Sequence, residues 1–132
     1  MRLAGGCHCG GVRFAYEGDP LWVGHCHCRD CQLTTGAPMT SWFIAPAAEV
    51  EIVGERRTYR SSDHATREFC PTCGCLLFFR TDKRPTHLDI VAACLDDPSA
   101  VAPSANIYVR SRIGFMDGFD PHLPSFEGNL PD

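Results

Sequence analysis

Seven of the nine cysteines fall into three short clusters whose spacing suits a metal ion. The clusters are Cys7-His-Cys9, Cys26-His-Cys28-Arg-Asp-Cys31 and Cys70-Pro-Thr-Cys73. Two thiolates one or two residues apart can turn toward one ion at a Zn–S distance of ~2.3 Å. A disulfide between such close neighbours would be strained. The pattern therefore predicts a zinc protein, with two Zn²⁺ ions in each chain.

The first predicted site is a closed, structural one. It takes its four thiolates from two of the clusters, namely from Cys7, Cys9, Cys70 and Cys73, and four thiolates complete a tetrahedral zinc. Gly74 can adopt the positive φ that such a turn needs, and Pro71 fixes the backbone just inside it. Zinc at this site would clip the N-terminal segment to the middle of the chain. The alternative is a set of buried core cysteines, which the spacing disfavours.

The second predicted site is different, because Cys26, Cys28 and Cys31 supply only three thiolates from one local turn. An open coordination position is typical of a catalytic zinc, whereas a structural zinc is closed by protein ligands. Three residues elsewhere could close it, namely Cys75, Cys94 and His64. If the position is open, a substrate thiol is the better guest, because zinc favours soft sulfur and binds it as a nucleophilic thiolate. Such a thiolate could attack a carbonyl carbon.

Two histidines lie within or beside the second cluster. His27 stands between two predicted ligands and His25 precedes them, so both side chains are expected to point away from the metal. Either one, or water, could return a proton to the product, and His27 is therefore named with the three cysteines as a candidate catalytic residue. A purely structural, hydrogen-bonded role is the alternative for each.

The elements that must position these residues are predicted to be mostly short strands. Val12, Phe14 and Tyr16 alternate with polar or small residues, as a strand with one buried face requires. The predicted strands cover 11–17, 21–25, 39–45, 50–53, 76–80, 88–94 and 107–109. One short helix is predicted at 30–35, with Asp30 as N-cap and Gly36 as its stop.

The C-terminal stretch, 114–132, is predicted to be an ordered coil packed by its aromatic residues, because prolines and glycines interrupt any regular pattern. Trp42, Phe115 and Phe119 are expected in the core rather than in a pocket. With 132 residues, 44% of them hydrophobic, the chain is expected to form one mainly β domain over 1–132 with little helix.

Composition also restricts the partners. The formal net charge is −4 and the basic residues form only short pairs, so nucleic acid is not an expected partner. No stretch is apolar enough for a signal peptide or a membrane span, so no membrane partner is expected and the predicted location is the cytoplasm. Disulfides are rare in that reducing compartment, which agrees with metal-binding cysteines.

Three motifs together resemble the glutathione-dependent formaldehyde-activating enzyme family, which includes centromere-protein-V-like proteins. They are Gly5-Gly-Cys-His-Cys-Gly-Gly-Val-Arg-Phe, His25-Cys-His-Cys-Arg-Asp-Cys with Thr35-Gly-Ala-Pro, and Phe69-Cys-Pro-Thr-Cys-Gly. The resemblance implies a compact fold of several short, coiled β-sheets stapled by zinc. It makes Cys7, Cys9, Cys70 and Cys73 the structural ligands and Cys26, Cys28 and Cys31 the catalytic ones. The chain departs from the family pattern at Cys75 and at Asn106, where a histidine is commoner.

The resemblance also implies an activity, the addition of glutathione to formaldehyde, which is a carbon–sulfur lyase reaction in the reverse sense. The leading hypothesis is an enzyme that activates a low-molecular-weight, glutathione-like thiol for reversible addition to formaldehyde or another small aldehyde. Two alternatives belong to other classes. One is a binding module that zinc stabilises without catalysis, and the other is a thiol redox sensor that loses its metal on oxidation.

Overall fold

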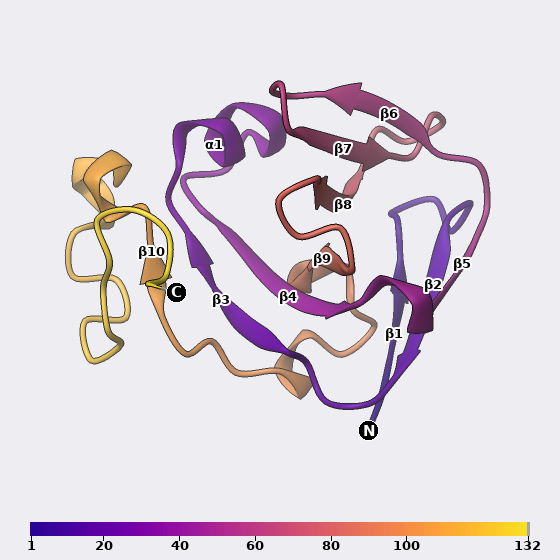
Figure 1. The fold of residues 1–132 in the computed structure, drawn as a ribbon, viewed down its shortest axis with the longest axis horizontal. Helices are drawn as coiled ribbons and strands as arrows, with labels where there is room; N and C mark the ends of the chain where they lie inside the picture. The colour runs from indigo at the N-terminus through magenta and orange to yellow at the C-terminus, as the bar shows by residue number, and fades with distance from the viewer. Residues whose placement is uncertain (132) are drawn as a thin grey trace.

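The computed structural model describes residues 1–131, and the predicted mainly β fold is confirmed. A three-stranded sheet has the order β1-β2-β5, with antiparallel neighbours. Its strands are β1 (Arg2–Gly6), β2 (Arg13–Glu17) and β5 (Val50–Val53). This sheet lies on one side of the molecule, opposite the C-terminal segment (Figure 1).

A second sheet has seven strands in the order β10-β3-β4-β9-β8-β7-β6. Its strands are β3 (Trp22–Cys26), β4 (Thr40–Pro46), β6 (Arg57–Arg60), β7 (Ala65–Phe69), β8 (Leu76–Thr81), β9 (His87–Val91) and β10 (Asn106–Ile107). All neighbours are antiparallel except β10, which runs parallel to β3 at the edge. The C-terminal part of the chain therefore joins the strand that ends at Cys26.

The helical elements are short. They are α1 (Arg29–Thr35) and the 3-10 turns η1 (Ala47–Glu49), η2 (Ala92–Cys94), η3 (Pro98–Ala100), η4 (Val109–Ser111) and η5 (Gly114–Met116). Gly36 ends α1 with a left-handed φ of 73°, as predicted. The predicted N-cap is wrong, because Cys28 and not Asp30 caps the helix: its sulfur accepts the Cys31 N–H. Within residues 1–131, no helix is long and apolar enough to cross a membrane.

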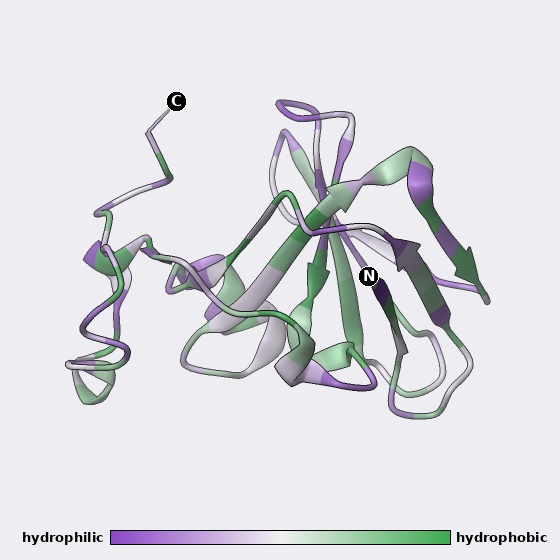
Figure 2. Ribbon diagram, turned by 90° about the horizontal axis from the view of Figure 1, so that it is seen from below, coloured by the Kyte–Doolittle hydropathy of each residue, from purple (hydrophilic) through white to green (hydrophobic). Residues whose placement is uncertain are grey.

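Aromatic residues join the two sheets in one core. Phe14 of β2 packs edge-on against Phe78 of β8, with ring centroids 5.8 Å apart, and lies 6.3 Å from Phe43 of β4. The predicted alternation in the second strand is confirmed, because Val12, Phe14 and Tyr16 are all buried. Hydrophobic residues accordingly colour the strands that cross the middle of the molecule (Figure 2). The fold thus depends on contacts made between the sheets as well as within them.

Replacing Phe78 with alanine is expected to lower the free energy of unfolding by about 3–5 kcal/mol. The side chain is fully buried and contacts the opposite sheet, so truncation leaves a cavity where the two sheets meet. Urea unfolding followed by circular dichroism measures this loss. Phe78→Leu is the control, and it should cost less because most of the volume is kept. Equal losses for both variants would contradict this interpretation.

Several elements differ from the sequence prediction. Strands β1, β6 and β7 were not predicted, because glycines or charged residues break their apolar pattern. The strand predicted at 88–94 ends at Val91, and a 3-10 turn follows it. The strand predicted at 107–109 is only Asn106–Ile107, and a left-handed Tyr108 ends it.

The C-terminal segment is an ordered coil through residue 131, apart from short 3-10 turns, and its backbone hydrogen-bonds along β10. The N–H of Asn106 donates to Pro124, and the N–H of Phe126 donates back to Asn106. Phe119 packs against His25, with ring centroids 4.9 Å apart. The expectation for Phe115 is wrong, because its side chain is 77% exposed. Asp132 lies outside the described residues.

Candidate metal centres and the adjoining cavity

The first cysteine cluster brings two distant turns together. Four Sγ atoms lie within 4.8 Å of one another, those of Cys7, Cys9, Cys70 and Cys73. Cys7 and Cys9 belong to the turn between β1 and β2, and Cys70 and Cys73 to the turn between β7 and β8. The cluster therefore joins the small sheet to the large one.

Backbone N–H groups point at these sulfurs. Val12 donates to Cys7 at 3.3 Å, and Cys73 donates to Cys70 at 3.5 Å. Gly74 has the predicted positive φ, 77°, which lets the turn close around the sulfurs. The N–H of Cys75 is the main reason that the pKa of Cys73 falls to about 6. The turn thus stabilises a thiolate before any metal arrives.

The second cluster lies where β3 passes into α1. The Sγ atoms of Cys26, Cys28 and Cys31 lie within 4.8 Å of one another. Cys26 and Cys31 are buried, whereas Cys28 is partly exposed. The thiols of Cys26 and Cys31, together with the Cys31 N–H, lower the pKa of Cys28 to about 2 although burial opposes the shift. The thiols of Cys28 and Cys31 in turn raise the pKa of Cys26. The three sulfurs therefore share protons, which a metal ion would displace.

Both clusters fit a thiolate-bound metal ion. Neighbouring sulfurs of a tetrahedral zinc site are separated by about 3.8 Å, given Zn–S bonds of ~2.3 Å. In the first cluster the sulfurs of Cys7 and Cys9 are 3.6 Å apart, and those of Cys9 and Cys70 are 3.7 Å apart. Each cluster can hold a metal ion, the first with four sulfur ligands and the second with three.

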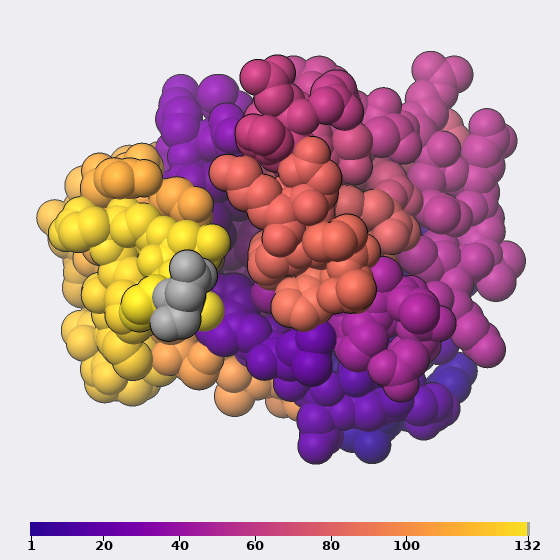
Figure 3. Space-filling view, in the orientation of Figure 1, coloured from indigo at the N-terminus to yellow at the C-terminus, as the bar shows by residue number. Residues whose placement is uncertain are grey.

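A cavity of about 480 Å³ opens on the second cluster. Its mouth lies between the C-terminal segment, in yellow, and the coral segment that joins β8 to β9 (Figure 3). The lining consists of the three cysteines, four aromatic side chains and several polar residues. They are Trp22, Cys26, Cys28, Asp30, Cys31, Trp42, Ser61, Ser62, His64, Ala65, Arg67, Phe79, Thr81, Lys83, Arg84, Asp89, Ile107, Tyr108 and Asn129. Trp42 is therefore both buried and part of the cavity wall.

The residues considered as closing ligands lie apart from the second cluster. Cys75 and Cys94 face each other, with their sulfurs 3.6 Å apart, and pack against the core between the sheets. His64 lies at the cavity wall, and its Nδ1 is 3.3 Å from a carboxylate oxygen of Asp82. Among residues 1–131, no ligand atom of another histidine, cysteine, aspartate or glutamate joins the group of three sulfurs.

The two histidines beside the cluster are buried and hydrogen-bonded. The ring of His25 lies 2.8 Å from Ser41 Oγ and 2.7 Å from Asp120 Oδ2. His27 Nε2 lies 2.9 Å from Asn106 Oδ1, so it carries the proton, and burial lowers the pKa of this ring. Neither ring belongs to the cavity wall as the structure describes it. His27 thus links the cysteine loop to β10.

Two residues of the site were missed at the sequence level. Arg67 is buried on β7, and its Nη1 lies 3.9 Å from the sulfur of Cys31. Tyr108 lines the cavity from a left-handed backbone conformation, with φ 56° and ψ 38°, which is strained for a bulky residue. No local signal could have identified Arg67. The prediction of a strand at 107–109 concealed the turn at Tyr108.

Comparisons with known proteins agree with these motifs. The family model described as "Glutathione-dependent formaldehyde-activating enzyme" matches residues 2–111. The fold is similar to the crystal structure of a Rhodobacter sphaeroides protein, with a TM-score of 0.60 and 21% sequence identity. That similarity covers 93% of this chain and 98% of the other, and it concerns the fold alone. The resemblance predicted from the cysteine motifs is thereby confirmed. The chain belongs to the glutathione-dependent formaldehyde-activating enzyme family.

Proposed function

We propose that this protein is a zinc-dependent enzyme of the carbon–sulfur lyase type. It activates a low-molecular-weight, glutathione-like thiol for reversible addition to formaldehyde or another small aldehyde. One observation carries the proposal: the three sulfurs of Cys26, Cys28 and Cys31 line a 480 Å³ cavity. A metal centre with three protein ligands and an adjoining cavity is the arrangement expected of a catalytic rather than a structural site.

The proposal assigns two zinc ions to each chain. Cys7, Cys9, Cys70 and Cys73 would hold a structural ion, and Cys26, Cys28 and Cys31 a catalytic one. Zinc bound by three thiolates favours a fourth sulfur and keeps it ionised and nucleophilic. This assignment agrees with the exclusively sulfur donors of both clusters.

In the proposed reaction a thiol RSH and formaldehyde form RS–CH₂–OH. The sulfur–carbon bond forms, the carbonyl double bond becomes a single bond, and the proton lost by the thiol ends on the oxygen. The aromatic wall formed by Trp22, Trp42 and Phe79 suits the apolar parts of such a thiol. Lys83 lies on the same wall and provides positive charge for a carboxylate group, whereas Arg84 beside it is paired with Asp89.

The proton needs a carrier that reaches the cavity. Both ring nitrogens of His25 are hydrogen-bonded, whereas His27 is bonded through Nε2 alone and its buried Nδ1 has no partner among the described residues. Neither ring lines the cavity, so both support the site from behind its wall. Tyr108 lies within the cavity, and burial, followed by the nearby cysteine sulfurs, raises the pKa of its phenol. It therefore keeps its proton at neutral pH and, together with water, is the candidate donor to the product oxygen.

The activity is tested by following adduct formation with NMR. Zinc-loaded protein, glutathione and formaldehyde are mixed, and exchange between free and added formaldehyde is compared with the spontaneous reaction. We expect acceleration of at least tenfold at micromolar protein, because a positioned and ionised nucleophile removes much of the entropic barrier. A rate equal to the spontaneous one would remove this proposal.

A matched control separates the site from the rest of the protein. Cys94→Ser changes a cysteine outside both clusters and should keep the accelerated rate. Protein stripped of metal should lose it. A binding module without catalysis would require a closed second centre, and the positions of Cys75, Cys94 and His64 give that alternative no support.

A further inference from the structure

Arg67 is a buried arginine whose charge is not matched by a carboxylate. The residue is only 4% exposed, and within residues 1–131 no carboxylate lies within ion-pair distance of its guanidinium. The neighbouring acids have other partners. Glu68 pairs with Arg56 and Arg80, and Asp89 pairs with Arg84. A buried cation is costly unless an anion compensates it. Burial raises the pKa of Asp89 and the charge of Arg67 is among those that oppose this shift, but the two make no ion pair, which leaves Arg67 without a carboxylate of the described residues in direct contact.

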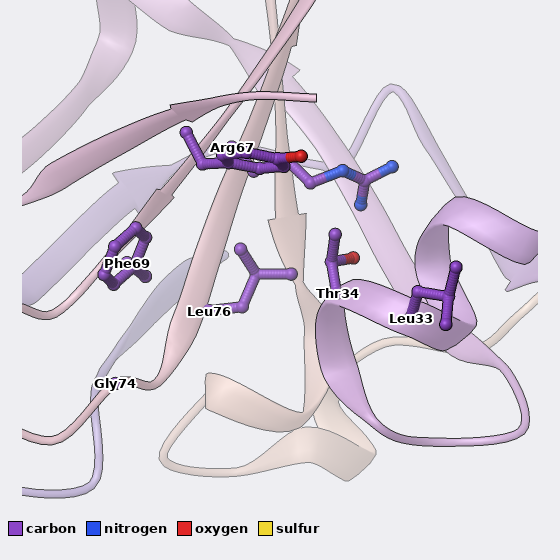
Figure 4. Close-up of a pocket in the computed structure, with 7 residues that line it drawn as sticks. Leu33, Thr34, Arg67, Phe69, Gly74 and Leu76 are labelled. Carbon is purple, nitrogen blue, oxygen red and sulfur yellow. The ribbon is translucent and has the colours of Figure 1, made fainter. Parts of the chain in front are cut away.

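The surroundings of the guanidinium show which group it contacts instead. Its Nη1 lies 3.9 Å from Cys31 Sγ, and its Cζ lies 4.8 Å from the centroid of the Phe79 ring. Figure 4 shows the side chain extending toward the helix that carries Thr34. Arg67 lines both the cavity on the second cluster and a neighbouring cavity of about 380 Å³. Among the groups in direct contact with the guanidinium, the sulfur of Cys31 is therefore the one that can carry negative charge.

Most N–H donors of the guanidinium have no side-chain hydrogen-bond partner within the described residues. A guanidinium has five N–H donors in a fixed fork. Within the described residues, the side-chain hydrogen bond that Arg67 makes is the one to the sulfur of Cys31. Its Nε is buried and has no partner there. Stacking on Phe79 fixes the plane of the group, so the Nη donors that Cys31 does not use are held in place beside the cavity that Arg67 lines.

We infer that Arg67 is the cationic partner of the three-sulfur centre and holds an anionic fourth ligand beside Cys31. The inference rests on the proposed function for the presence of a metal ion. Three thiolates and Zn²⁺ carry one net negative charge, and a bound substrate thiolate adds another. A fixed positive charge next to Cys31 offsets this accumulation where water is excluded. Arg67 is thus a positioning residue for the anionic thiol.

The test uses Co²⁺-loaded protein and 2-mercaptoethanol, a thiol without a carboxylate. Thiolate binding to cobalt is read from its sulfur-to-metal charge-transfer absorption, with no aldehyde present. Arg67→Met keeps length and apolar bulk but removes the charge, and we expect the affinity for 2-mercaptoethanol to fall about 10-fold to 100-fold. Arg67→Lys keeps the charge and should recover most of this affinity. Retention of Co²⁺ at the second site should follow the same order.

The controls make each outcome informative. Arg56→Met removes an arginine that pairs with Glu68 and lies outside the cavity wall, so it should bind 2-mercaptoethanol like the wild type. If Arg67→Met does not fold, Arg67→Gln, which is polar but uncharged, replaces it in the same comparison. Wild-type affinity in the uncharged variant, or an Arg67→Lys variant as weak as the uncharged one, overturns the inference. A wild-type protein that takes up no second cobalt ion overturns the proposed function itself.

Discussion

Cys28→Ser is expected to reduce the metal content from two ions to one per chain and to return adduct formation to the spontaneous rate. Serine is a good N-cap, so it can accept the Cys31 N–H and preserve the helix that Cys28 now caps. The substitution therefore removes a soft ligand while disturbing the local fold little. Elemental analysis of the purified protein measures the metal, and NMR with glutathione and formaldehyde measures the rate.

The stability of this variant provides the internal check. Because the second cluster lies at the end of one strand and one short helix, we expect a loss of no more than about 1–2 kcal/mol. Cys75→Ser, outside both clusters, should keep two ions and the full rate. A Cys28→Ser protein that retained both ions and its activity would contradict the assignment of the catalytic site.

Cys9→Ser is expected to have the largest effect on stability. Cys9 is exposed, so its replacement leaves no cavity in the core, but it removes a ligand that connects the turns of two sheets. Structural zinc contributes apparent free energies of about 10–16 kcal/mol in small zinc domains. Loss of one of four ligands should therefore lower the melting temperature by roughly 10 °C or more. Differential scanning calorimetry measures this change.

The comparison with metal removal completes this test. A strong chelator should destabilise the wild type at least as much as the substitution, and it should destabilise Cys9→Ser much less, because that variant has already lost the ion. Cys75→Ser makes the same sulfur-to-oxygen replacement at a cysteine that belongs to neither cluster, so this variant should melt within a few degrees of the wild type. Equal melting of Cys9→Ser and the wild type would show that the first cluster does not stabilise the fold.

The parts of the fold that could be predicted are those with a local apolar pattern. Phe14 and Tyr16 alternate with outward residues, and the structure has a strand there. The strand Ala65–Phe69 was missed because its central residues are charged, and a buried strand tolerates these charges only where partners from other segments of the chain reach them. Glu68, for example, is buried because Arg56 and Arg80 both reach it.

The candidate site divides in the same way. Spacing within the chain was enough to group Cys26, Cys28 and Cys31. The combination of Cys7 and Cys9 with Cys70 and Cys73 followed from the four ligands that a structural zinc requires. Arg67 could not be found, because its approach to Cys31 depends on how β7 lies beside α1. Nor could the cavity, whose walls come from segments as distant as Ser61 and Asn129.

The parallel pairing of β10 with β3 brings two different kinds of chain segment to the same cavity. Cys26, Cys28 and Cys31 lie where β3 passes into α1, whereas Tyr108 and Asn129 come from the irregular segment that follows β10. Coil of this kind accepts insertions and exchanges more readily than a central strand does. Remodelling of the C-terminal segment would therefore change the shape of the cavity while leaving the three-cysteine cluster in place.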